Sequence, residues 1–73
     1  MAVETSTADA AMAMAIAMLA RREHGRRELA YKLRGKGVAE PVVDEVIGRL
    51  QARGDLSEQR FVESLLRQRL RQG

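Results

Sequence analysis

Apolar positions recur along the chain at helical spacing, and the first group lies in "AAMAMAIAMLA", residues 10–20. The alternation of Ala with larger side chains there has the two-residue period of a strand. Ala, Met and Leu are strong helix formers, however, and β-branched residues are nearly absent. The same residues also fill the i, i+3, i+4 and i+7 positions of one helical face: Met12, Ala15, Ile16 and Leu19. We therefore predict a helix over residues 8–22, with Ser6 and Asp9 of "STAD" close to a capping box at its start.

Glycines separate this helix from two further helical segments. Gly25 breaks the first pattern, and "RRELAYKLR" then places Leu29 and Leu33 one helical turn apart. Pro41 suits the first turn of a third helix, which Gly54 ends. The apolar stripe of the third helix is expected to consist of Val43, Val46, Ile47 and Leu50.

A fourth helix is predicted from a cap at Asp55 or Ser57 to about Arg71. No segment reads as a strand, so we expect an all-α fold: a small three-helix unit with a fourth helix, of the tandem helical-repeat type. A weak internal echo, "IAMLAR" (16–21) and "VESLLR" (62–67), recurs at an offset of 46 residues. The expected core is Met12, Ile16, Leu19, Leu29, Leu33, Val43, Val46, Ile47, Leu50 and Phe61.

Composition narrows the possible classes of function. The 73 residues include one His and no Cys, so we predict no bound metal and no cofactor. The apolar run is shorter than the roughly 20 residues that cross a bilayer. Acidic rather than basic residues, Glu4 and Asp9, precede it, unlike in a secretory signal. We expect a soluble, cytoplasmic protein without a membrane partner. His24 has no nucleophile beside it, so we interpret it as a polar turn residue and expect no enzymatic activity.

Charge is segregated along the chain. Residues 21–36 carry seven basic and two acidic side chains, whereas residues 40–58 carry a net charge of −3. Opposite charges four residues apart predict ion pairs on helices: Glu23–Arg27, Glu28–Lys32, Glu45–Arg49 and Glu63–Arg67. The basic residues left without an obvious local partner are Arg21, Arg22, Arg26, Arg34 and Lys36. This surplus predicts a surface that binds an anionic partner.

A DNA-reading helix-turn-helix is one alternative, because the second and third helices have the required outline. The first turns of the third helix would then meet the DNA, but they carry Glu40, Asp44 and Glu45, which phosphates repel. These carboxylates disfavour base reading in the major groove. A stand-alone DNA-binding helical domain remains the alternative interpretation.

Several segments in this order resemble the amino-terminal part of the RecX family, bacterial regulatory proteins that modulate the RecA recombinase. The resemblance is carried by "LARREHGRREL", "KLRGKG", "VVDEVIGRLQARG" and "LSEQRFVESLLRQR", and it covers about residues 12–73. RecX proteins are built from tandem three-helix units, which would explain the internal echo. The resemblance implies a protein without enzymatic activity that binds RecA filaments on DNA and inhibits them in recombination, repair and the SOS response.

The resemblance also implies how the chain is divided. We expect a flexible N-terminus over residues 1–7, a first three-helix unit over residues 8–54, and a connecting helix over residues 55–73 that opens a second, truncated unit. Typical members continue for two further units, so the chain is either a piece of a longer protein or a shortened homologue. Leu66 and Leu70 would then expose apolar surface and favour weak self-association through the last helix.

Two further expectations concern individual residues. The family commonly has Ser where this chain has Gly25, a difference expected to affect only the turn between the first two helices. Seven basic residues are expected to contact the RecA filament or, weakly and electrostatically, DNA: Arg21, Arg22, Arg26, Arg27, Lys32, Arg34 and Lys36.

Overall fold

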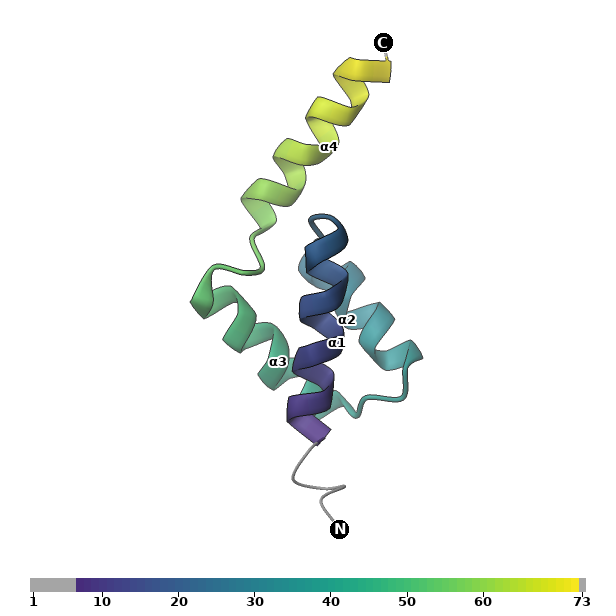
Figure 1. The fold of residues 1–73 in the computed structure, drawn as a ribbon, viewed down its shortest axis with the longest axis vertical. Coiled ribbons are helices and arrows are strands. Elements are labelled where there is room, and N and C mark those ends of the chain that lie inside the picture. The colour runs from purple at the N-terminus through teal and green to yellow at the C-terminus, as the bar shows by residue number, and fades with distance from the viewer. Residues whose placement is uncertain (1–6, 73) are drawn as a thin grey trace.

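The structure, a computed structural model, describes residues 7–72 and consists of four helices joined by short turns (Figure 1). They are α1 (Thr7–Arg21), α2 (Arg26–Gly35), α3 (Glu40–Arg53) and α4 (Glu58–Gln72). No strand occurs in residues 7–72, so the predicted all-α fold is confirmed. The proposed cap at Ser6 lies outside the described residues. Within them, no helix is both long and apolar enough to cross a membrane.

The ends of α3 and α4 follow from local chemistry. Gly54 adopts a left-handed conformation (φ 84°) and its N–H donates to the Gln51 carbonyl oxygen at 3.1 Å, which ends α3. Ser57, rather than Asp55, caps α4: its Oγ accepts a hydrogen bond of 3.2 Å from the backbone N–H of Arg60. Asp55 instead forms an ion pair with Arg53 at 2.9 Å.

Helices α1, α2 and α3 pack against one another around a single core. The core positions predicted on α2 and α3 are confirmed, and Val38 and Leu56 from the turns join them. The buried apolar side chains are Ala11, Ala15, Leu29, Leu33, Val38, Val43, Val46, Ile47, Leu50 and Leu56.

The predicted core face of α1 is wrong in part. Ile16 is 40 % exposed, and Met12 and Leu19 are only partly buried, whereas Ala11 and Ala15 are fully buried. Because interaxial distance depends on side-chain size at the contact, two alanines let α1 approach its neighbours closely. The larger side chains pack at the margins of that contact.

Helix α4 extends away from the three-helix core, and its C-terminal end lies far from the other helices (Figure 1). None of its residues is buried, although Phe61 is partly so. Phe61, expected in the core, therefore lies at its edge.

Candidate partner-binding surface

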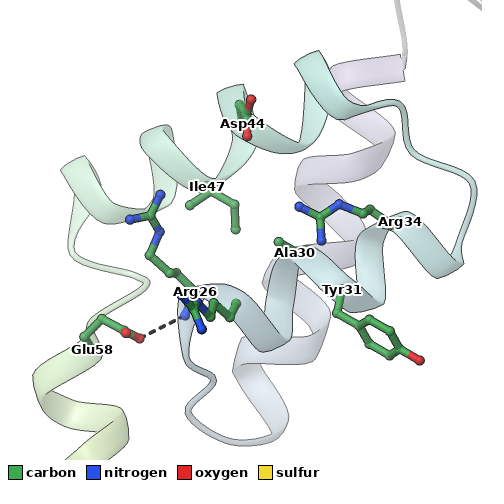
Figure 2. A pocket seen from close by; sticks show the side chains of 8 residues that line it. Arg26, Ala30, Tyr31, Arg34, Asp44, Ile47 and Glu58 are labelled. Carbon is green, nitrogen blue, oxygen red and sulfur yellow. Dashed lines mark hydrogen bonds between the residues drawn. The ribbon is translucent and has the colours of Figure 1, made fainter.

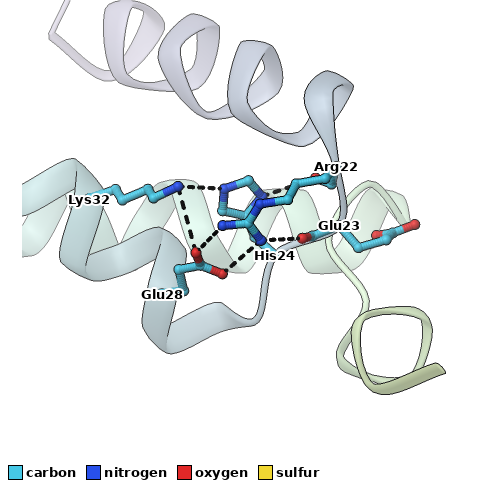
Figure 3. A network of polar contacts seen from close by, with 5 residues as sticks. All are labelled: Arg22, Glu23, His24, Glu28 and Lys32. Atoms are coloured by element: carbon cyan, nitrogen blue, oxygen red, sulfur yellow. Dashed lines mark hydrogen bonds and ion pairs between the residues drawn. The ribbon is translucent and has the colours of Figure 1, made fainter. Parts of the chain in front are cut away.

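An ion cluster ties the end of α1 to α2 (Figure 3). The Arg22 guanidinium donates two hydrogen bonds to the Glu28 carboxylate, and Lys32 Nζ lies 3.6 Å from Glu28 Oε2. The hydrogen bonds from Arg22, with the positive charges around it, lower the pKa of the Glu28 carboxyl below its ordinary value. The same contact raises the pKa of Arg22. Glu28 is thus ionised and engaged by cations on two sides.

His24 lies beneath this cluster and is only 2 % exposed. Its Nδ1 lies 3.0 Å from the Arg22 carbonyl oxygen, and its Nε2 lies 3.1 Å from Lys32 Nζ. A carbonyl can only accept and an ammonium can only donate, so Nδ1 carries the proton and Nε2 accepts. The interpretation of His24 as a polar turn residue is incomplete. It does lie in the turn, but it is buried and holds the Lys32 side chain.

A second ion pair spans the turn between α2 and α3. The Arg34 guanidinium donates to the Glu40 carboxylate, which raises the pKa of Arg34. The expectation that Arg22 and Arg34 lack local partners is therefore wrong, because the turns bring Glu28 and Glu40 to them.

The predicted pairs within helices are only partly formed. Lys32 pairs with Glu28 as predicted, and Arg49 Nη2 lies 2.8 Å from Glu45 Oε2. Glu23 was expected to pair with Arg27, but its Oε2 accepts from Arg60 Nε at 2.9 Å instead. Glu63 was expected to pair with Arg67, but its Oε2 accepts a hydrogen bond from Gln59 Nε2 at 3.3 Å instead.

Four members of the basic run form no ion pair within residues 7–72, and all are exposed: Arg21, Arg26, Arg27 and Lys36. Arg26 and Arg27 line a groove of about 720 Å³ between α2 and α3 (Figure 2). Tyr31, 75 % exposed, lies on the same wall, and Asp44 lies on the α3 wall. The α2 side of the groove is therefore basic, and the Tyr31 ring points away from α3 (Figure 2).

Six of the seven predicted basic residues separate into two groups in space. A second cavity, of about 380 Å³, is lined by Arg21, Arg22 and Lys32. It lies where the turn of residues 22–25 joins α1 to α2, a junction called here the α1–α2 corner. Arg26, Arg27 and Arg34 line the α2–α3 groove. Lys36 lies in the turn after α2 and lines neither cavity. Within residues 7–72 no group of three potential metal ligands is present.

The first turn of α4 is fixed to the α1–α2 corner by contacts that sequence reasoning missed. Glu58 Oε1 accepts from the backbone N–H of Arg26 at 2.9 Å, across 32 positions of sequence. Arg60, besides its bond to Glu23, donates to the carbonyl oxygens of Gly54 (2.7 Å) and Asp55 (3.1 Å). Spacing rules for helices cover only neighbouring turns, so no local signal could have revealed these contacts.

Comparison with known proteins identifies the family. The sequence-family model for the first three-helix domain of RecX matches residues 11–50. This match covers more than half of the chain and includes all seven predicted basic residues. The chain belongs to the RecX family. The resemblance seen in the sequence is thereby confirmed.

Individual RecX relatives agree with this assignment. Regulatory protein RecX of Ectopseudomonas mendocina is 48 % identical over 59 residues, covering 81 % of this chain and 39 % of that protein. The RecX proteins of Pseudomonas savastanoi pv. phaseolicola and Pseudomonas putida (strain W619) are 44 % and 42 % identical over all 73 residues, covering 47 % of each relative. The chain thus spans about half the length of the curated relatives it matches or less. No solved structure matches it significantly.

Proposed function

We propose that this chain is a non-enzymatic regulatory module that binds RecA filaments on DNA and restrains their activity in recombination, repair and the SOS response. Its membership of the RecX family supports a regulatory function, since its relatives are named as regulatory proteins. The observation that carries the proposal is the group of exposed cations without an ion pair in residues 7–72: Arg21, Arg26, Arg27 and Lys36.

These cations suit a filament that contains DNA. A Lys or Arg that neutralises a phosphate releases a counterion, so this attraction weakens steeply as salt rises. Arg22 and Arg34 contribute less, because each already has a carboxylate partner. We therefore assign the main contact to Arg26 and Arg27, which lie side by side in the first turn of α2.

The test measures RecA-catalysed strand exchange and the linked ATPase as the chain is added. The wild-type chain should slow both weakly, since a single three-helix unit offers few linked contacts. Charge reversal at Arg26→Glu with Arg27→Glu should abolish the effect without changing helicity. The matched control reverses two exposed arginines of α4, Arg67→Glu with Arg69→Glu, and should keep the effect.

Salt and naked DNA complete the experiment. Each phosphate contact on duplex DNA adds about 0.9 to the slope of log affinity against log salt, so inhibition should fall as salt rises. Tight inhibition that salt leaves unchanged would contradict the proposal. Equal binding to naked DNA and to RecA filaments would favour the alternative, a stand-alone DNA-binding domain. Glu40, Asp44 and Glu45 are all exposed on the first turns of α3 and disfavour that alternative.

A further inference from the structure

The cavity at the α1–α2 corner gathers three cations, one each from α1, the turn that follows it and α2. It has a volume of about 380 Å³ and is lined by Met18, Arg21, Arg22, His24 and Lys32. The carboxylate next to these cations, Glu28, is occupied by the two hydrogen bonds from Arg22. The local charge is therefore positive after Glu28 is counted, and the cavity suits an anion.

The Lys32 ammonium forms one hydrogen bond within the described residues, to His24, and has further donors available. One N–H of its ammonium donates to His24 Nε2 at 3.1 Å. Glu28 Oε2, at 3.6 Å, is an ion partner beyond hydrogen-bond distance. An ammonium has three donors, and the Lys32 side chain is 40 % exposed. Donors of Lys32 thus remain available to a ligand, while the buried ring of His24 keeps Nζ in place.

Arg21 supplies a second set of donors to the same cavity. It is exposed and forms no ion pair within the described residues, whereas Arg22 is occupied by Glu28. An arginine fork and a lysine point charge are the usual donors for a phosphate group. Among the residues that line the cavity, Met18 is the one apolar side chain and none is aromatic, apart from the His24 ring that holds Lys32. The cavity therefore offers a base nothing to stack on and suits a backbone phosphate.

We propose that the corner cavity is a phosphate site, in which Lys32 and Arg21 hold one phosphate of a nucleic-acid backbone and His24 is the residue that positions Lys32. Figure 3 shows the contact between His24 and Lys32. This inference rests on the proposed function, since the nucleic acid is the DNA of the filament.

The first test measures binding of short oligo-dT over a range of salt concentrations. Each phosphate contact to a single strand adds about 0.7 to the slope of log affinity against log salt. Lys32→Gln should lower that slope by about this amount. Arg69→Gln removes the same charge from α4, outside the cavity, and should leave the slope unchanged. Equal effects of the two substitutions would overturn the proposal, because they would mean that only net charge matters.

The second test concerns His24. His24→Phe removes the acceptor and should lower the slope as Lys32→Gln does, whereas His24→Gln keeps an acceptor and should restore it. A purely structural His24 would change the melting temperature in both variants and the slope in neither, and this outcome would overturn its assigned role. If His24→Phe does not fold, His24→Leu takes its place, because it also removes the acceptor and should lower the slope only if His24 positions Lys32.

Nitrogen-15 NMR of the wild-type chain identifies the site directly. Oligo-dT should shift the signals of Lys32 Nζ and His24 Nε2, and inorganic phosphate should shift them only at much higher concentration. Shifts confined to the Arg26 and Arg27 amides would overturn the proposal, as would saturation of the Lys32 signal by inorganic phosphate first.

The two proposals can fail separately. If the wild-type chain has no effect on RecA but its oligo-dT slope still depends on Lys32, the proposed function is wrong and the phosphate site stands. If the chain restrains RecA through Arg26 and Arg27 but substitution of Lys32 leaves the slope unchanged, only the phosphate site is wrong.

Discussion

The ring of Phe61, in the first turn of α4, lies directly against Gly25, the residue before α2. A Cβ added to Gly25 would lie 2.8 Å from Phe61 Cε2 and 3.1 Å from Glu58 Oε1. Gly25 is buried and has an extended backbone (φ −77°), so the glycine is required by space and not by conformation. The expectation that this position affects only the turn between the first two helices is therefore wrong, because Gly25 also packs against the first turn of α4.

Gly25→Ala should displace the Phe61 ring and loosen α4 from the corner. A Cβ has no room there unless a rigid aromatic ring moves, so the substitution should lower the melting temperature and change the Phe61 ring signals in NMR spectra. In a Phe61→Ala background the same substitution should cost much less, since the obstacle is gone. Additive effects of the two substitutions would contradict the packing described.

Gly48→Ala is the matched control for Gly25→Ala. Gly48 lies within α3, is exposed, and a Cβ there would meet nothing within 4 Å. Alanine inside a helix is more favourable than glycine by about 0.5–1 kcal/mol. We expect Gly48→Ala to raise the free energy of unfolding by about that amount, as chemical denaturation would measure.

The sequence allowed the helices and most of the core to be predicted, because their signals are local. Leu29 and Leu33 lie one turn apart, and Gly54 ends α3 where expected. The face of α1 was misjudged because burial was assigned to its largest side chains. Close contact between helices buries Ala15, which lies on the predicted face, and Ala11, which does not, and a chain of alternating Ala and Met gives no local sign of that choice.

The candidate surface was less predictable, because its electrostatics depend on how the chain turns. The Glu28–Lys32 pair follows from helical spacing and was predicted. The pairs Arg22–Glu28 and Arg34–Glu40 each join residues six positions apart across a turn, and their formation depends on turn geometry. The ion pair between Glu23 and Arg60 joins residues 37 positions apart, so it forms only when α4 packs against the turn after α1.

Truncation of buried leucines should separate core from surface. Leu29 and Leu50 are fully buried, so Leu29→Ala or Leu50→Ala should lower the free energy of unfolding by about 2–5 kcal/mol, a large share of what a small domain has. Leu70→Ala is the matched control, since Leu70 is 81 % exposed and should cost little. Undiminished cooperative stability of both core variants in chemical denaturation would show that the packing is different.

Acid should weaken the α1–α2 corner through Glu28. The pKa of its carboxyl is lower in the folded chain than its ordinary value of 4.5, chiefly because Arg22 donates hydrogen bonds to it. The unfolded chain therefore binds this proton more readily than the folded chain. The stabilisation is fully present above the ordinary value and is lost as pH falls through the folded value.

Thermal melts over that acidic range measure this contribution. Glu28→Gln should lower stability at neutral pH and flatten the decline of stability with acid. Glu63→Gln is the control, because Glu63 is exposed on α4 and its hydrogen-bond partner, Gln59, is neutral. An acid decline as steep in Glu28→Gln as in the wild-type chain would rule out this ion cluster as its source.

The exposed apolar face of α4 should make the chain self-associate. Val62, Leu66 and Leu70 follow one another at four-residue spacing, so they lie on one side of the helix, and they are 50 %, 58 % and 81 % exposed. Contiguous apolar surface of this kind favours association. Sedimentation equilibrium should therefore show a weak, concentration-dependent dimer, and Leu66→Gln with Leu70→Gln should restore the monomer. Tyr31→Gln removes an exposed side chain from α2 and should leave association unchanged. A strict monomer at high concentration, or association that persists in the double variant, would show that this face does not bind a second copy.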